Sequence, residues 1–148
     1  MKPLKSFNEF LMLGIVKKQA PDKSRSKFLV EETEISFEGL NERLEKMRIN
    51  NKNANSIVKD CYDILMSLIR ARMCLDGYKS VGAGAHEAEV AYMKLLKIDQ
   101  RDVDFINQIR YLRNGTIYYG TILDEIYAQN VVGFTKKMYL KLKGLLKE

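Results

Sequence analysis

The stretch Ser56-Ile-Val-Lys-Asp-Cys-Tyr-Asp-Ile-Leu-Met-Ser-Leu-Ile-Arg-Ala-Arg-Met73 decides the fold class, because its apolar residues recur with the period of a helix. Most of them stand three or four positions apart, which places them on one face of an α-helix. Ser56 is a residue type that caps helix starts, so we expect the helix to begin there. The positions of this face are Val58, Cys61, Leu65, Leu68 and Met73.

On the N-terminal side of this stretch, helix signals dominate and strand signals are scarce. We expect a short first helix from a Ser6 cap through Val16, ended by the turn at Ala20-Pro21-Asp22. A second helix is expected from about Ser24 to Met47. The polar run Asn50–Asn55 breaks the apolar pattern and predicts a loop. The second helix would place Phe37, Leu40, Leu44 and Met47 on one side.

On the C-terminal side, Gly77 and the stretch Ser80–Ala85 predict a flexible connection, followed by a fourth helix over Glu87–Leu96. Asp99 is expected to open a fifth helix, and a last one is expected from about Thr121 to Lys147. The fold class that follows is all-α, an up-and-down bundle of five to six helices. We expect one domain over 1–148, with N-terminal helices in 1–50 and the core in 55–148.

Length and composition agree with a single globular domain. The chain has 148 residues, 46% of them hydrophobic and 30% charged, which is enough to bury a core. No apolar run approaches the roughly 20 residues needed to span a bilayer, so we expect no membrane partner and a cytoplasmic location. Cys61 and Cys74 lie about 20 Å apart along one expected helix, too far for a disulfide, and predict buried thiols.

The net positive charge of the chain has two interpretations. A net charge of +6 favours attraction to nucleic acid or to anionic membranes, yet many helical proteins are equally basic. The basic C-terminal segment fits a solvated helix face as well as it fits an RNA-binding one. Its lysines are Lys136, Lys137, Lys141, Lys143 and Lys147.

The fifth helix leads into Arg110-Tyr-Leu-Arg-Asn-Gly-Thr-Ile-Tyr-Tyr-Gly120, the most unusual stretch of the chain. If the helix continues past Gly115, a turn of 100° per residue divides it into two faces, with Arg113 on their boundary. The face expected to meet the core holds Phe105, Ile109, Leu112, Thr116 and Tyr119. The face expected to point away holds Asn107, Arg110, Tyr111, Asn114 and Tyr118.

Two interpretations of the outward face remain open. Tyrosines, asparagines and an arginine are less typical of a plain solvated face than Lys, Glu and Gln, which favours a surface for a partner or a ligand. Alternatively, neighbouring helices cover the tyrosines, and the arginines pair with acids such as Glu87 or Asp124.

This stretch resembles the motif of the HEPN family, small all-helical domains whose RNase members carry an Arg, often followed by Asn, then four to six residues and a His. Arg113 and Asn114 match, and Tyr118 stands where the histidine of the family would be. The segments His86-Glu-Ala-Glu-Val-Ala-Tyr-Met93 and Asp99–Asp104 look like those of archaeal HEPN proteins. The similarity runs from Asn55 to the C-terminus.

The resemblance implies a four- or five-helix bundle that pairs as a homodimer, with the motif of each subunit in a shared cleft. Active members cut RNA without a metal. Others partner a minimal nucleotidyltransferase, sometimes as the toxin of a toxin and antitoxin pair. The resemblance therefore implies RNA or a nucleotidyltransferase as a partner, and no cofactor.

Metal-free RNA cleavage needs a proton acceptor or donor and a cation beside the phosphate. Arg113 supplies the cation, but a tyrosine with an ordinary pKa near 10 is a poor base at neutral pH. Three alternatives are open for this role: His86 reaches the site, Tyr118 donates a proton, or Tyr118 or Tyr119 accepts a nucleotidyl group. We treat His86, the only histidine, as a candidate although lone histidines near helix starts are usually caps or surface residues.

The candidate catalytic residues are thus Arg113, Asn114 and Tyr118, and the candidate ligand-binding residues are Arg110, Tyr111, Tyr119 and His86. No Cys or His set has metal-ligand spacing, so no metal is expected, and Gly82-Ala-Gly84 is too short for a phosphate loop. The expected function is RNA or nucleotide binding by a HEPN-like protein, as a degenerate metal-independent endoribonuclease or toxin-type component. The alternative is a non-catalytic interaction module that docks a minimal nucleotidyltransferase.

Overall fold

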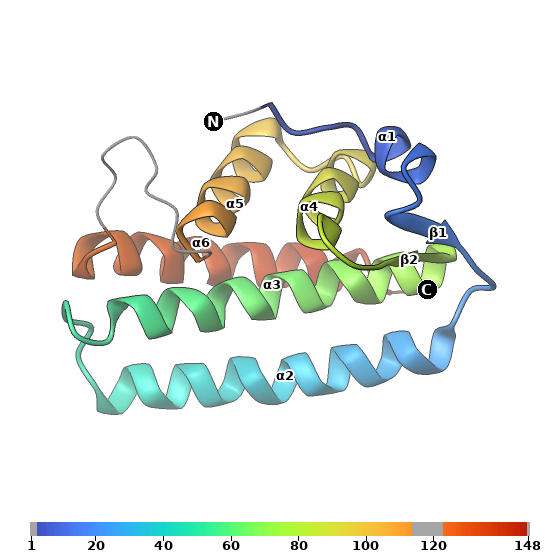
Figure 1. The fold of residues 1–148 in the computed structure, drawn as a ribbon. Coiled ribbons are helices and arrows are strands. Elements are labelled where there is room, and N and C mark those ends of the chain that lie inside the picture. Colours follow the sequence, from blue (N-terminus) through green and yellow to red (C-terminus); the bar gives the residue numbers. More distant parts are fainter. Residues whose placement is uncertain (1–2, 114–122, 148) are drawn as a thin grey trace.

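The computed structural model describes residues 3–113 and 123–147, and it confirms the expected all-α bundle (Figure 1). Within these residues the chain forms six helices and one short two-stranded ribbon. In chain order these are α1 (Phe7–Met12), β1 (Val16–Lys18), α2 (Lys23–Lys46), α3 (Ala54–Asp76), β2 (Tyr78–Ser80), α4 (Ala85–Leu95), α5 (Gln100–Arg113) and α6 (Glu125–Gly144).

Helix α3 lies at the centre and packs against α2, α4, α5 and α6. Thirteen of its 23 residues are buried, so its apolar surface extends beyond one face and needs neighbours on several sides. All five positions predicted for its apolar face are buried. In Figure 1, α2 runs antiparallel to α3, α6 runs in the same direction as α3, and the shorter α4 and α5 stand across the other side of α3.

The start of α3 differs from the prediction that Ser56 caps it. The helix begins at Ala54, and Ser56 is an exposed residue inside its first turn. Asn50 closes the preceding turn, because its side-chain oxygen accepts hydrogen bonds from the backbone N–H groups of Lys52 and Asn53, at 2.8 and 3.1 Å. Asparagine is suited to such self-closing turns, so the polar run leads directly into the helix.

The first helix is shorter than predicted, and Val16 does not belong to it. Ser6 caps α1 as expected, because its hydroxyl accepts a hydrogen bond from the Glu9 N–H at 3.2 Å. The helix ends at Met12, and Gly14 follows with a φ of +75°, which an α-helix does not accommodate. Val16 instead pairs with Ser80 in the antiparallel ribbon of β1 and β2.

A flexible connection was predicted after α3, and this prediction is wrong for its first residues. Tyr78–Ser80 form the strand β2, which pairs with β1. Gly77 ends α3 with a φ of +82°, in the left-handed region. A Cβ at this position would lie 2.6 Å from the backbone oxygen of Gln19, so only glycine fits without a shift. The close approach lets the chain before α2 lie against the end of α3, where the Gln19 N–H donates to the Gly77 oxygen at 2.9 Å.

The last helix begins at Glu125, because the Asp124 side chain caps it by accepting a hydrogen bond from the Tyr127 N–H at 2.9 Å. The expected start at Thr121 lies outside the described residues. Cys61 and Cys74 are free and buried, as predicted. In the part of the chain that the structure describes, no helix is both long and apolar enough to cross a membrane.

Candidate functional site

The predicted site residues divide into those that the structure describes and those that it does not. Arg113 is the last residue of α5, while Asn114, Tyr118 and Tyr119 lie outside the described residues. Ile109 and Leu112 are buried as predicted, and Phe105 packs edge-on against Phe134 of α6 at 4.8 Å between ring centroids. Up to Arg113, the core-facing side of α5 is therefore confirmed.

Asn107 was predicted to point away from the core, and this prediction is wrong. Its exposed fraction is only 4%, and its side-chain oxygen accepts a hydrogen bond from Arg110 Nε at 3.0 Å. The reason is that α5 packs against both α3 and α4, which covers more of its circumference than a single seam requires. Arg110 is half-buried, and its guanidinium also stacks on the Tyr111 ring at 4.6 Å from the centroid.

Arg113 reaches across from α5 to α3. Its Nε and Nη2 each lie 3.2 Å from Asp63 Oδ1, and its Cζ lies 5.6 Å from the centroid of the Tyr62 ring. The acids expected as partners, Glu87 and Asp124, are not the ones it meets. Both members of the pair keep contact with solvent, at 31% exposed for the Arg113 side chain and 52% for that of Asp63.

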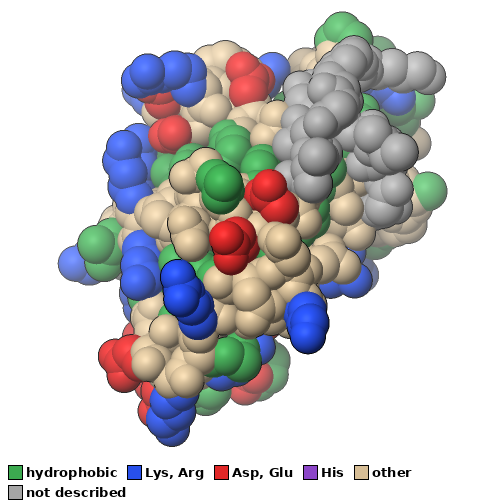
Figure 2. Space-filling view, turned by 90° about the vertical axis from the view of Figure 1, so that its left-hand side faces the viewer, with side chains coloured by type: hydrophobic (Ala, Val, Ile, Leu, Met, Phe, Trp, Pro, Cys, Tyr) green, Lys and Arg blue, Asp and Glu red, His purple; other side chains and the backbone are tan. Residues whose placement is uncertain are grey.

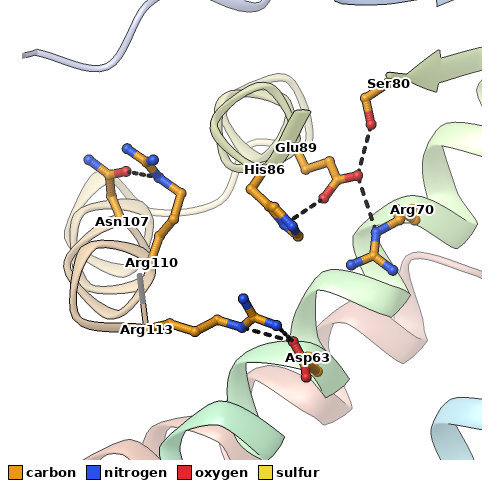
Figure 3. Close-up of polar contacts among 8 residues, drawn as sticks. All are labelled: Asp63, Arg70, Ser80, His86, Glu89, Asn107, Arg110 and Arg113. Atoms are coloured by element: carbon orange, nitrogen blue, oxygen red, sulfur yellow. Dashed lines mark hydrogen bonds and ion pairs between the residues drawn. The ribbon is translucent and has the colours of Figure 1, made fainter. Parts of the chain in front are cut away.

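Tyr62 connects Arg113 with the only histidine of the chain. Its side chain is 1% exposed, and the His86 ring lies 6.1 Å away between centroids. His86 is the second residue of α4, so α3, α4 and α5 each bring one member to this place. Figure 3 shows His86 extending from α4 into the space between α3 and α5, toward the side of α3 that meets Arg113.

Behind His86 lies a buried carboxylate with three neighbours. Glu89 Oε2 accepts hydrogen bonds from Arg70 Nε at 3.1 Å and from the Ser80 hydroxyl at 2.8 Å. Its other oxygen, Oε1, lies 3.6 Å from His86 Nδ1 (Figure 3). This distance is longer than a hydrogen bond, so the carboxylate acts on the imidazole through its charge and favours the protonated ring.

We call this arrangement the Tyr62 cluster. Its members are Tyr62, Asp63, Arg70, His86, Glu89, Arg110 and Arg113. Burial raises the pKa of the Tyr62 phenol far above its usual value, and the charge of Glu89 adds to this rise. The positive charges of Arg110, Arg113 and Arg70 oppose this rise.

Two buried polar atoms of the Tyr62 cluster lack a hydrogen-bond partner within the described chain. They are the Tyr62 hydroxyl and Glu89 Oε1. Leaving a buried polar atom unpaired costs about 1–3 kcal/mol, and such atoms in native proteins are often completed by a bound water or ligand. The two atoms therefore leave one hydroxyl and one carboxylate oxygen of the cluster for hydrogen bonds to groups outside the described chain.

The sequence identified Arg110, Arg113 and His86 but missed Tyr62, Asp63, Arg70 and Glu89. The available signal was the spacing of His86 and Glu89, which places both on one side of α4. Nothing local pointed to Tyr62 or Asp63, because they lie inside a helix whose pattern indicates a core element. Among the described residues, no group of three or more His, Cys, Asp or Glu side chains is placed to hold a metal ion.

Charge on the neighbouring surface is mixed. Figure 2 shows the face at the left-hand side of Figure 1, where Lys and Arg side chains stand mainly on the left of the view and acidic side chains are scattered among them and near the middle. Comparisons of the chain with protein-family models, with curated proteins and with solved structures found no match. Its function is therefore argued from the site.

Proposed function

We propose that this protein is a HEPN-like RNA-binding protein whose Tyr62 cluster contacts the sugar-phosphate backbone and carries metal-independent endoribonuclease chemistry. The observation that supports the proposal is the position of Arg113 and His86, which lie 5.6 and 6.1 Å from one tyrosine ring although they belong to different helices. An arginine and a histidine are the pair that this chemistry requires, and His86 takes the place of the histidine missing at Tyr118.

Each residue has a separate role in this proposal. Arg113 stabilises negative charge on the phosphate, which its forked donors contact after leaving the solvent-exposed Asp63. His86 Nε2 accepts the proton of the attacking 2′-hydroxyl, and the new bond from the 2′-oxygen to phosphorus forms as the bond from phosphorus to the 5′-oxygen breaks. The departing 5′-oxygen takes a proton from water. The Glu89 carboxylate, 3.6 Å from Nδ1 on the opposite side of the ring, stabilises the imidazolium by its charge. Arg110 and the half-buried Tyr111 extend the binding surface along α5.

The net charge of +6 supports a polyanionic partner. Lys136, Lys137 and Lys141 are exposed on α6, whereas Lys143 is bound to Glu34 at 2.8 Å. The homodimer that the resemblance implies and a cytoplasmic location are both part of the proposal. Light scattering on the purified protein tests the dimer, for which a mass of twice 17.1 kDa is expected.

The deciding experiment measures binding and cleavage of a single-stranded RNA with EDTA present, at two salt concentrations. The variants are Arg113→Gln and His86→Ala. Arg43→Gln is the matched control, because Arg43 also forms an exposed ion pair with α3, through Asp60, but lies outside the Tyr62 cluster. We expect Arg113→Gln to weaken binding and reduce its salt dependence, by about one phosphate contact. His86→Ala should abolish cleavage and largely retain binding.

Equal loss in all three variants, or cleavage unchanged in His86→Ala, would contradict the proposal. Urea denaturation of each variant shows whether it is folded, so that a loss of binding or cleavage is not caused by unfolding. Because the Arg113–Asp63 pair is exposed, we expect Arg113→Gln to change the free energy of unfolding by less than about 1 kcal/mol.

A second function is favoured by the partners that the arginines already have. Asp63 offsets the charge of Arg113, and the neutral Asn107 occupies one hydrogen-bond donor of Arg110, so both arginines offer less to a phosphate. The second candidate is a non-catalytic module that docks a minimal nucleotidyltransferase through the Tyr111 side of α5. Binding that tolerates salt, with no RNA cleavage, would favour it over the first.

A further inference from the structure

A cavity of about 460 Å³ lies between the start of α2, the second half of α3, the strand β2 and α4. This volume is within the range of sites that hold small molecules. Its lining combines polar and apolar side chains in about equal measure and comes from four separate parts of the chain. The side chains that matter for its chemistry are Arg25, Arg70, Cys74, Lys79, Ser80 and Glu89.

Arg70 is the fixed cation of this cavity. Its Nε donates to the buried carboxylate of Glu89, and Ser80 donates to the same oxygen (Figure 3). In the described residues, no hydrogen bond is made by its two terminal nitrogens, and 33% of its side chain is exposed. The guanidinium is thus held in place on one side and keeps donors for an anion on the other.

Arg25, from the start of α2, supplies a second cation to the lining. Its guanidinium lies close enough to Cys74 that it lowers the thiol pKa, against the larger rise caused by burial. Lys79 of β2 adds a third positive charge at the exposed rim. Both carboxylates of the cavity already accept hydrogen bonds. Glu89 accepts from Arg70, and Asp22 caps α2 by accepting from the backbone N–H of Arg25 at 2.9 Å. With three cationic and two anionic side chains in its lining, the cavity has a net positive charge.

The apolar part of the lining is formed by Leu29, Met73 and Tyr78. A ligand that fits both parts has an anionic head and a small apolar body. We propose that this cavity binds a small organic anion, with its carboxylate or phosphate between Arg25 and Arg70 and its apolar part against Tyr78. The site shares Arg70 and Glu89 with the Tyr62 cluster, whereas Arg25, Cys74 and Lys79 belong to the cavity alone. A variant of Arg25 therefore tests anion binding here without changing the residues proposed to act on RNA.

The test uses phenyl phosphate and benzoate as probes, with benzyl alcohol as the neutral control. Binding is followed through the NMR signals of the arginine Nε–H groups, together with calorimetry. We expect saturable binding of at least one anion that shifts the Arg70 signal, and none of the alcohol. The two anions show whether phosphate or carboxylate is preferred.

Arg25→Gln is the main variant, because Arg25 is exposed and its loss leaves the Glu89–Arg70 pair intact. It should weaken binding about tenfold, as expected for one charge-assisted hydrogen bond. Lys27→Gln is the matched control, since Lys27 is an exposed cation of the same helix that does not line the cavity. The Lys27→Gln variant should bind the anions with the same affinity as the unmodified protein.

A second measurement uses the thiol in the wall. Cys74 lines the cavity and Cys61 does not, so a bound anion should slow the alkylation of Cys74 by iodoacetamide and leave Cys61 unaffected. Absence of saturable binding for both anions would overturn the proposal. Equal affinity in the Arg25→Gln variant would overturn it as well, because the site would then lie elsewhere.

Discussion

At the scale of single residues, Tyr62 and Tyr92 are both buried tyrosines with different hydrogen bonding. The Tyr92 hydroxyl donates to Asp76, which also accepts from Arg72 at 2.8 Å. The Tyr62 hydroxyl has no partner among the described residues. A buried hydroxyl without a partner destabilises the folded state, whereas a satisfied one stabilises it.

We therefore expect opposite results from the two Tyr→Phe changes. Tyr92→Phe should lower the free energy of unfolding by about 1–2 kcal/mol, because it leaves Asp76 with one donor fewer. Tyr62→Phe should have no effect or stabilise by up to about 1 kcal/mol. Urea denaturation of both variants measures the difference. A large loss in Tyr62→Phe would show that its hydroxyl is satisfied, for instance by a buried water.

At the scale of the elements, the glycines Gly77 and Gly133 differ in what their position requires. Gly77 ends α3 in the left-handed region, and a Cβ added to it would lie 2.6 Å from the backbone oxygen of Gln19. Gly133 lies inside α6 on an exposed side, with nothing within 4 Å of a Cβ. The first position needs glycine, while the second only weakens its helix.

Substitution by alanine should accordingly destabilise at one position and stabilise at the other. Gly77→Ala is expected to lower the free energy of unfolding by more than about 1 kcal/mol, because the backbone of α3 or of Gln19 must move. Gly133→Ala should raise it by about 0.5–1 kcal/mol. Thermal unfolding of the two variants compares them directly. Similar effects of both changes would contradict the close approach of α3 and Gln19.

At the scale of the whole molecule, the buried thiol of Cys61 couples stability to alkaline pH. Burial raises its pKa from an ordinary value of 9.0 to about 11. Because the folded-state pKa is the higher one, the stabilisation is complete below about pH 9 and is lost as the pH rises toward 11. Burial also raises the pKa of the Tyr62 and Tyr92 phenols, which act in the same direction at higher pH.

The expected result is a fall in the free energy of unfolding between pH 9 and pH 11. Cys61 contributes at most about 1.4 kcal/mol per pH unit to this fall. Urea denaturation at several pH values measures it, with Cys61→Ala as the comparison. That variant should be less stable at neutral pH but lose less stability between pH 9 and pH 11. An equal slope in both proteins would show that Cys61 does not titrate in this range.

Much of the fold could be predicted because helical periodicity is a local property. The buried face of α3, the Ser6 cap and the core-facing side of α5 up to Arg113 were all visible in the order of apolar and polar residues. The ribbon was not, since Val16 and Ser80 pair across a long stretch of chain and each strand is only three residues long. So short a strand has no periodicity to recognise.

The order of apolar and polar residues was sufficient to predict the helical class of this protein, and its motif and lone histidine made Arg110, Arg113 and His86 candidates. A single domain stays a prediction. Only the tertiary structure decided that Arg113 meets Asp63, fifty residues away, that Asn107 is buried, and that His86 and Arg113 share the Tyr62 ring. The physical reason is that these contacts depend on how α3, α4 and α5 pack together. A helix pattern specifies which face is buried, but not which residue of another helix will cover it.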